Sequence, residues 1–144
     1  MKNLLLGAWL AIILAALGAA HGADPRVAAS DAKAIRAVVQ AQMDAFAKDD
    51  GPRAFSYASP GIRQQFGSHE VFIAMVRASY PVVYRPAAVR FLPAKLVEGE
   101  HVQPVQMTDG DGQIWISLYR MEKQKNGAWR IAGCDLLRAG TTAT

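Results

Sequence analysis

The chain has 144 residues, of which 51% are apolar and 19% are charged. This balance is typical of a single globular domain and excludes a disordered or collagen-like chain. The formal net charge is +4, but basic and acidic residues are interleaved without a long run of either sign, so we expect no nucleic-acid binding. One cysteine, Cys134, excludes a disulfide within the chain.

Residues 1–22 are predicted to form a secretory signal peptide. Lys2 supplies the positive charge, residues 4–20 carry no charge, and small residues precede the polar Asp24. A cut after Gly22 places Ala20 and Gly22 at the −3 and −1 positions, and a cut after Ala20 also fits. An uncleaved membrane anchor is the alternative, because seventeen uncharged residues reach the lower limit of a span. We expect an exported protein, periplasmic or secreted, with no stable membrane span after cleavage.

Helical patterns fill the first half of the remaining chain. Ser30 or Asp31 is expected to cap the first helix. Its apolar residues repeat with helical spacing and fall on one face: Ile35, Val38, Val39, Met43 and Phe46. Asp49-Asp50-Gly51-Pro52 is expected to end this helix, because proline cannot continue the hydrogen-bond ladder.

Three shorter helices are predicted to follow. The first covers about residues 53–58. The second is capped by Ser59, has Pro60 in its first turn and ends at Gly67. The third is capped by Ser68 and ends at Pro81.

Strand patterns fill the second half, with turns marked by glycine. The expected strands are residues 89–92, 95–98, 102–107, 113–123 and 128–137. Asn126-Gly127 is the strongest turn signal and predicts a two-residue hairpin loop, because both residues tolerate a positive φ. Asp109-Gly110-Asp111-Gly112 predicts another turn and does not match a calcium loop, because Arg120 stands where the twelfth-position glutamate would be.

Helices followed by an antiparallel meander indicate an α+β fold. We expect one domain over residues 30–137, with N-terminal helices packed in a curved, cone-like antiparallel sheet, and a flexible tail at 138–144. Strand 113–123 has apolar residues on both faces, so both faces are expected to be covered. Helices would cover one face, and a partner or another part of the chain the other, which favours a homodimer.

Several short runs of sequence carry a resemblance to a bacterial family. They are Ser59-Pro60-Gly61-Ile62-Arg63, Phe72 with Met75-Val76 and Tyr80-Pro81, Val83-Tyr84-Arg85-Pro86, Trp115 with Tyr119-Arg120, and Asn126-Gly127-Ala128-Trp129-Arg130-Ile131-Ala132-Gly133-Cys134. Together they span Ile35 to Leu137 and resemble domain of unknown function 4864. The order of elements is similar to the cone-shaped nuclear-transport-factor-two-like fold. The resemblance implies no catalytic residue, because the family has no established activity.

Four residues are candidates for ligand binding. Tyr84 and Arg85 place an aromatic ring and a fixed cation beside Pro86, where they could line a pocket mouth. With the two-residue loop, Arg120 faces Gly133 and becomes a diagonal neighbour of Asp135 on an apolar face. That face is expected to hold Ile114, Ile116, Leu118, Arg120, Ile131, Asp135 and Leu137. The pair is interpreted as a structural ion pair or as a polar anchor for an anionic group.

Other reactive side chains fit structural roles better. Cys134 lies inside a strand and is interpreted as a small packing residue rather than a nucleophile. His69 and His101 are far apart in the sequence and form no metal-ligand spacing, so we expect no metal and no cofactor.

Three function classes stay open on the sequence alone. The leading hypothesis is a binding or accessory module for a small ligand or a protein partner. The alternatives are an enzyme that performs acid–base chemistry on a small organic molecule in the cone, and a structural protein that uses the outer face of the sheet. A pocket lined by apolar groups would favour binding, and a buried group with a perturbed pKa would favour the enzyme.

Overall fold

The computed structural model describes residues 26–140, so the predicted signal segment and residues 141–144 lie outside the described residues. Within this range, five helices precede five strands, which confirms the predicted α+β class. The helices are α1 (Ala29–Ala47), α2 (Gly51–Ser56), α3 (Pro60–Phe66), α4 (His69–Ser79) and α5 (Pro81–Tyr84). The strands are β1 (Ala88–Phe91), β2 (Lys95–Val97), β3 (Glu100–Thr108), β4 (Ile114–Lys123) and β5 (Trp129–Arg138).

The helix ends follow local capping chemistry at most positions. Ser59 and Ser68 accept backbone N–H bonds from Ile62 and Val71, so both predicted caps are confirmed. Gly67 ends α3 with a φ of 77°, a conformation that glycine adopts without strain. The predicted cap at Ser30 or Asp31 is wrong, because α1 begins one residue earlier and its N-terminus has no side-chain cap.

Pro81 begins a helix as well as ending one. The sequence predicts that it terminates the preceding helix, and α4 does end at Ser79. Pro81 then occupies the first turn of the short α5, where its missing N–H costs no hydrogen bond. The single turn of α5 buries Val82, Val83 and Tyr84.

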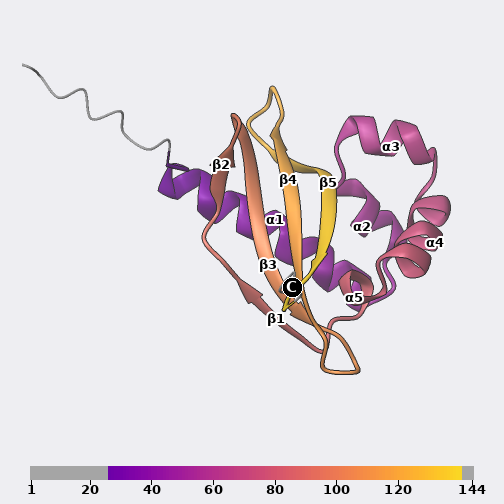
Figure 1. Cartoon of the computed structure of the whole chain (residues 1–144). Coiled ribbons are helices and arrows are strands. Elements are labelled where there is room, and N and C mark those ends of the chain that lie inside the picture. Colours follow the sequence, from indigo (N-terminus) through magenta and orange to yellow (C-terminus); the bar gives the residue numbers. More distant parts are fainter. Residues whose placement is uncertain (1–25, 141–144) are drawn as a thin grey trace, which may run out of the picture.

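Helix α1 lies against one face of the sheet and provides the floor of the core (Figure 1). Its buried side chains include Ile35, Val39, Met43 and Phe46, which confirms the predicted apolar face. The sheet contributes fully buried side chains to the same core, among them Val105 and Met107 of β3 and Tyr119 of β4.

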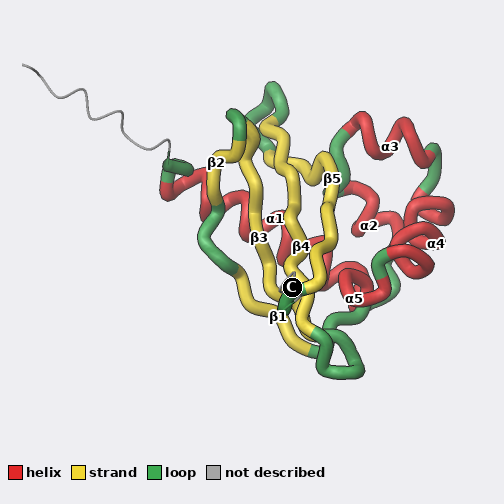
Figure 2. The backbone as a smooth tube through the Cα atoms, viewed as in Figure 1, coloured by secondary structure: helices red, strands yellow, loops and turns green. Residues whose placement is uncertain are grey.

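The five strands form one antiparallel sheet in the order β1-β3-β4-β5, with β2 also paired to β3. The long strands bend along their length, and the helices gather on one side of them (Figure 2). Strand β5 is an edge strand. The segment between α2 and α3 joins this edge, because Ser59 N–H donates to the Ile131 carbonyl and Ile131 N–H donates to the Tyr57 carbonyl.

The β4–β5 hairpin differs from its prediction in two ways. The loop has three residues, because Gln124 N–H bonds to the Ala128 carbonyl, and only Gly127 has a positive φ. This loop alone would shift the register by one residue. A bulge at Ala132 shifts it back, so that Gly133 is opposite Arg120 and Asp135 is opposite Leu118, as predicted. The two departures cancel beyond the bulge.

Ile131 is the residue whose predicted face is wrong. It precedes the bulge and is opposite Met121, on the side that faces the helices. Ile131 is 6% exposed and belongs to the core. The bulge therefore explains why one residue changes face while Arg120 and Asp135 keep theirs.

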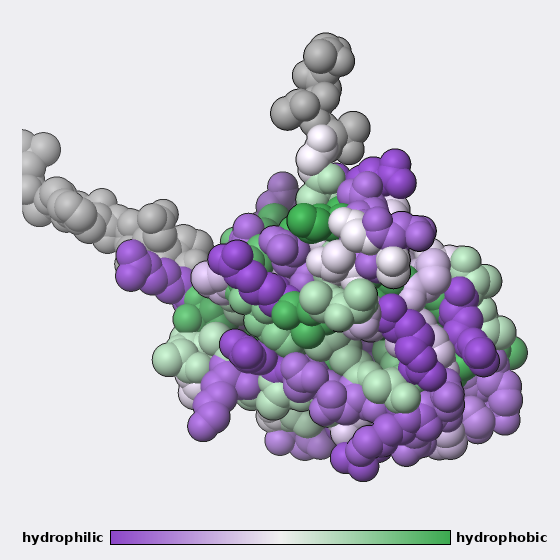
Figure 3. Space-filling view, turned by 90° about the horizontal axis from the view of Figure 1, so that it is seen from below, coloured by the Kyte–Doolittle hydropathy of each residue, from purple (hydrophilic) through white to green (hydrophobic). Residues whose placement is uncertain are grey.

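The other face of the sheet carries apolar side chains without a covering element among residues 26–140. Ile114 and Leu137 are 40% and 52% exposed on this outer face. The strands thus have apolar residues on both faces, as predicted, but the described chain covers only one. Figure 3 shows another surface, the end of the molecule seen from below. On it, hydrophilic and hydrophobic residues are mixed and form no broad hydrophobic patch.

Candidate functional site

A cavity of about 280 Å³ lies between the helices and the edge of the sheet at β5. Its lining comes from α1, the segment before α3, α3, α4, α5, β4 and β5. Most of the lining side chains are apolar, and they include Phe46, Ile62, Phe66, Phe72, Met75 and Val76. Such a hollow, apolar with a few polar groups, is the usual form of a small-molecule site.

Tyr119 carries a buried hydroxyl group that packing alone does not explain. Its side chain points from β4 into the core, and its hydroxyl is fully buried with no hydrogen-bond partner among the described residues. Tyr119 is also part of the cavity lining. Because an unpaired buried hydroxyl costs free energy, a partner supplied by a ligand would recover that cost.

Gln42 adds a second buried polar group to the same cavity. It is 3% exposed, and its amide nitrogen donates to the Ala54 carbonyl at 3.1 Å. That bond fixes the amide group and leaves its side-chain oxygen as an acceptor. Gln42 and Tyr119 therefore place an amide side chain and a phenol side chain among the mostly apolar residues that line the cavity.

Arg120 and Asp135 lie at the rim of the cavity, on the outer face of the sheet. Arg120 Nε is 3.4 Å from Asp135 Oδ2, which confirms the predicted neighbour relation. Both side chains are well exposed, at 45% and 60%. The cavity lining includes both residues together with Gly133, so the opening reaches around the edge strand β5.

Gly133 permits this position of Arg120. A Cβ atom at residue 133 would lie 2.2 Å from Arg120 Nη2 and 2.6 Å from Arg120 Cζ, so the guanidinium rests directly on the glycine backbone. The bulge at Ala132 brings Gly133 opposite Arg120. Any side chain at 133 would push the guanidinium away from the rim.

Cys134 lines the cavity as an uncharged group. Burial raises the pKa of its thiol to about 12, and the neighbouring Asp135 carboxylate acts in the same direction. Burial also raises the pKa of Tyr119 well above 10. Both side chains therefore stay protonated at neutral pH, which agrees with the interpretation of Cys134 as a packing residue.

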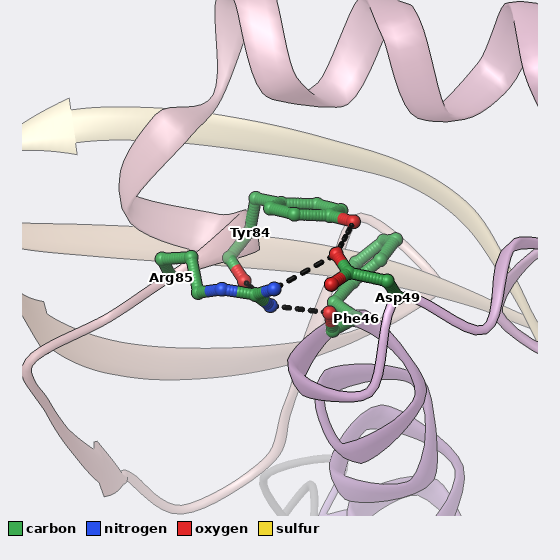
Figure 4. A network of polar contacts seen from close by, with 4 residues as sticks. All are labelled: Phe46, Asp49, Tyr84 and Arg85. Carbon is green, nitrogen blue, oxygen red and sulfur yellow. Dashed lines mark hydrogen bonds and ion pairs between the residues drawn. The ribbon is translucent and has the colours of Figure 1, made fainter.

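Tyr84 and Arg85 form a separate network with Asp49 (Figure 4). The Tyr84 hydroxyl donates to Asp49 Oδ1 at 2.5 Å, and Arg85 Nη2 donates to the same oxygen at 2.8 Å. Arg85 also donates to the Phe46 carbonyl at the end of α1. Asp49 occupies a left-handed conformation, with a φ of 54°, and the network ties this turn to α5.

The charges in this network shift the acidity of its members. The Tyr84 hydroxyl bond lowers the pKa of Asp49, and the positive charge of Arg85 lowers it further. The same hydrogen bond to Asp49 raises the pKa of Tyr84. These contacts connect the end of α1 to the end of α5, which indicates a structural role.

The sequence did not single out Asp49 as a candidate site residue. The only signal for it was its position directly after a predicted helix.

The four residues predicted from the sequence thus fall into two groups. Arg120 and Asp135 meet at the rim of the cavity, whereas Tyr84 and Arg85 lie at the Asp49 network. Tyr119, Gln42 and the apolar wall of the cavity were not singled out from the sequence. The only signal for Tyr119 was its place on the inner face of a long strand.

Two further structural features bear on the kind of site. No three His, Cys, Asp or Glu side chains within residues 26–140 are grouped so that they could hold a metal ion. No helix in this range has the length and apolar character needed to cross a membrane.

Comparisons with known proteins identify a family and nothing more specific. The searches among curated proteins and among solved structures found no match, so the likeness to the nuclear-transport-factor-two-like fold stays a prediction. Residues 28–144 match the model of a family described as domain of unknown function (DUF4864). Because this match covers most of the chain, the protein belongs to the DUF4864 family.

Proposed function

We propose that this protein binds a small, mainly apolar organic molecule in the cavity beside β5, with the Tyr119 hydroxyl as its polar anchor. The observation that carries the proposal is the buried Tyr119 hydroxyl, which has no hydrogen-bond partner among residues 26–140 and belongs to a residue that lines an apolar cavity of about 280 Å³. A ligand with one hydrogen-bonding group and an apolar body would complement both features.

The ionisation of the cavity supports binding rather than acid–base catalysis. A general acid or base works best with a pKa near the operating pH. Tyr119 and Cys134 are buried groups with perturbed pKa values, but burial raises those values further from neutrality, away from the range of a general acid or base. Neither group therefore exchanges protons readily at neutral pH. For this reason we place the enzyme hypothesis second to a binding or accessory role.

We also propose that the domain acts outside the cytoplasm, after removal of residues 1–22. The support is the sequence of this segment, in which Lys2, an uncharged stretch and small residues occur in the order of a secretory signal.

Titration with phenol and toluene tests the binding proposal. The two probes have the same size and differ in a hydroxyl against a methyl group. We expect both to cause saturable amide shift changes at cavity residues such as Gly133 and Cys134 in nuclear magnetic resonance spectra. Tyr119→Phe should weaken phenol about fivefold relative to toluene, because it removes one hydrogen bond worth about 1 kcal/mol. Shift changes outside the cavity, or none at saturating probe, would exclude this site.

A second candidate function is self-association through the outer face of the sheet. The exposed Ile114 and Leu137 favour it, because apolar groups on a sheet face gain from burial. The face also carries charges of both signs, with Arg90 on β1 at one side and Asp135 on β5 at the other. A two-fold axis along the strands would bring each side over its opposite, so we propose a second copy of this chain as the occupant.

Light scattering tests the homodimer. We expect the mass of two chains for the wild type and of one chain for Leu137→Asp. Val71→Asp is the matched control, because Val71 is 53% exposed on α4, away from the sheet, and should leave the dimer intact. A single-chain mass for the wild type at high concentration would overturn the proposal.

A further inference from the structure

We infer that the ligand is a free α-amino acid with an apolar or aromatic side chain, whose carboxylate binds Arg120 and whose ammonium group binds Asp135. This inference rests on the cavity of the proposed function, since it names the class of molecule that the cavity would hold. It assigns the polar contacts to the charged pair Arg120 and Asp135 in addition to the Tyr119 hydroxyl, which an apolar side chain would not reach by a hydrogen bond. It adds one observation that the binding proposal does not use, the pair of opposite charges at the rim. It also uses the cavity volume again, to set the size of the apolar part of the ligand.

The guanidinium of Arg120 has hydrogen-bond donors that are available to a ligand. Its one recorded partner among the described residues is Asp135, reached through Nε at 3.4 Å. The two terminal nitrogens form no hydrogen bond with a residue in the range 26–140, and the guanidinium lies against the Gly133 backbone at the edge of the cavity. A guanidinium with both terminal nitrogens available binds a carboxylate through two parallel hydrogen bonds.

Asp135 decides which kind of carboxylate can be held there. A simple carboxylic acid would bring a second negative charge next to Asp135 and would be repelled. An α-amino acid carries an ammonium group beside its carboxylate, and that group can bind the free oxygen of Asp135. The paired charges at the rim therefore match a zwitterion better than an anion or a cation.

The volume sets the size of the apolar part. An apolar cavity of about 150 Å³ is large enough for a benzene ring. The cavity here has about 280 Å³, enough for a ring or a branched chain together with the short link to the headgroup. Phe66, Phe72 and Ile62 provide an apolar surface for such a side chain.

Isothermal titration with three related probes tests the inference. L-Phenylalanine carries both charges, 3-phenylpropanoate lacks the ammonium group, and 2-phenylethylamine lacks the carboxylate. We expect wild-type protein to bind L-phenylalanine at least tenfold more tightly than either analogue. Asp135→Asn should weaken L-phenylalanine and strengthen 3-phenylpropanoate, because it removes both the ammonium partner and the repulsion.

Arginine variants separate the rim from the rest of the outer face. Arg120→Met should weaken L-phenylalanine about tenfold or more, and Gly133→Ala should have a similar effect by displacing the guanidinium. Arg130→Met is the matched control, because Arg130 lies on the outer face of β5, opposite Glu122, and does not line the cavity; it should leave binding unchanged.

Each outcome has a distinct meaning. If phenol binds in the cavity but L-phenylalanine binds no better than 3-phenylpropanoate, the amino-acid inference is wrong and the binding proposal stands. If neither phenol nor L-phenylalanine binds, both are wrong. If L-phenylalanine binds and Arg120→Met does not weaken it, the assigned role of Arg120 is wrong and the headgroup inference falls with it.

Discussion

Replacement of Phe46 by alanine should cost about 3–5 kcal/mol of the free energy of unfolding, since it leaves a cavity at the centre of the core. Phe46 is 1% exposed, and its ring centroid lies 5.2 Å from that of Tyr84 and 6.2 Å from that of Phe72. The residue therefore connects α1, α4 and α5 at one point. The loss is a large share of the roughly 5–15 kcal/mol that stabilises a typical domain.

Urea unfolding followed by tryptophan fluorescence measures this loss. Val71→Ala is the matched control, because it also truncates an apolar side chain but at an exposed position of α4, where the change should be within about 0.5 kcal/mol. A loss for Phe46→Ala as small as that of the control would show that α1, α4 and α5 do not meet around this ring.

The second large effect is the protection of Cys134 from thiol reagents. With a pKa of about 12, roughly one thiol in ten thousand is ionised at pH 8, against about one in four for an unperturbed cysteine. Because the thiolate is the reactive form, ionisation alone should slow labelling about a thousandfold. We expect this ratio when labelling by dithiobis-nitrobenzoate is compared between the native protein and the protein in denaturant.

The same shift predicts a dependence of stability on alkaline pH. The folded state holds the Cys134 thiol protonated, whereas the unfolded chain ionises it from about pH 8.5 upward. The free energy of unfolding should therefore fall as the pH rises from about 8.5 towards 12, and this fall should be shallower in Cys134→Ala. Native labelling within tenfold of the denatured rate, or an unchanged alkaline slope in the variant, would contradict the burial of the thiol.

Local chemistry made part of this fold predictable. The caps at Ser59 and Ser68 and the stop at Gly67 depend on residues within one helical turn, and all three occur as predicted. The cap of α1 was not predictable in this way, because its first turn is left without a side-chain partner even though Ser30 and Asp31 are present. Asp31 instead lies 3.3 Å from Lys123 of β4, a contact over a long sequence distance.

The candidate site shows where prediction from sequence stops. The contact between Arg120 and Asp135 was predicted from the strand register. The prediction holds because the three-residue loop and the bulge at Ala132 shift the register by one residue in opposite directions. Neither event was visible in the residue pattern. The cavity depends on how side chains of α1, α3 and α4 meet the edge of β5, and the unpaired hydroxyl of Tyr119 exists only in that assembly.

The most direct test of the Tyr119 anchor is the free energy of unfolding of the wild type and of Tyr119→Phe, each with and without phenol. Without phenol, the variant should be more stable by about 1–2 kcal/mol, because it no longer buries an unpaired hydroxyl. Phenol should stabilise the wild type more than the variant, since a ligand that binds only the native state raises stability by an amount that grows with its affinity. A less stable variant, together with equal stabilisation of both proteins by phenol, would contradict the account.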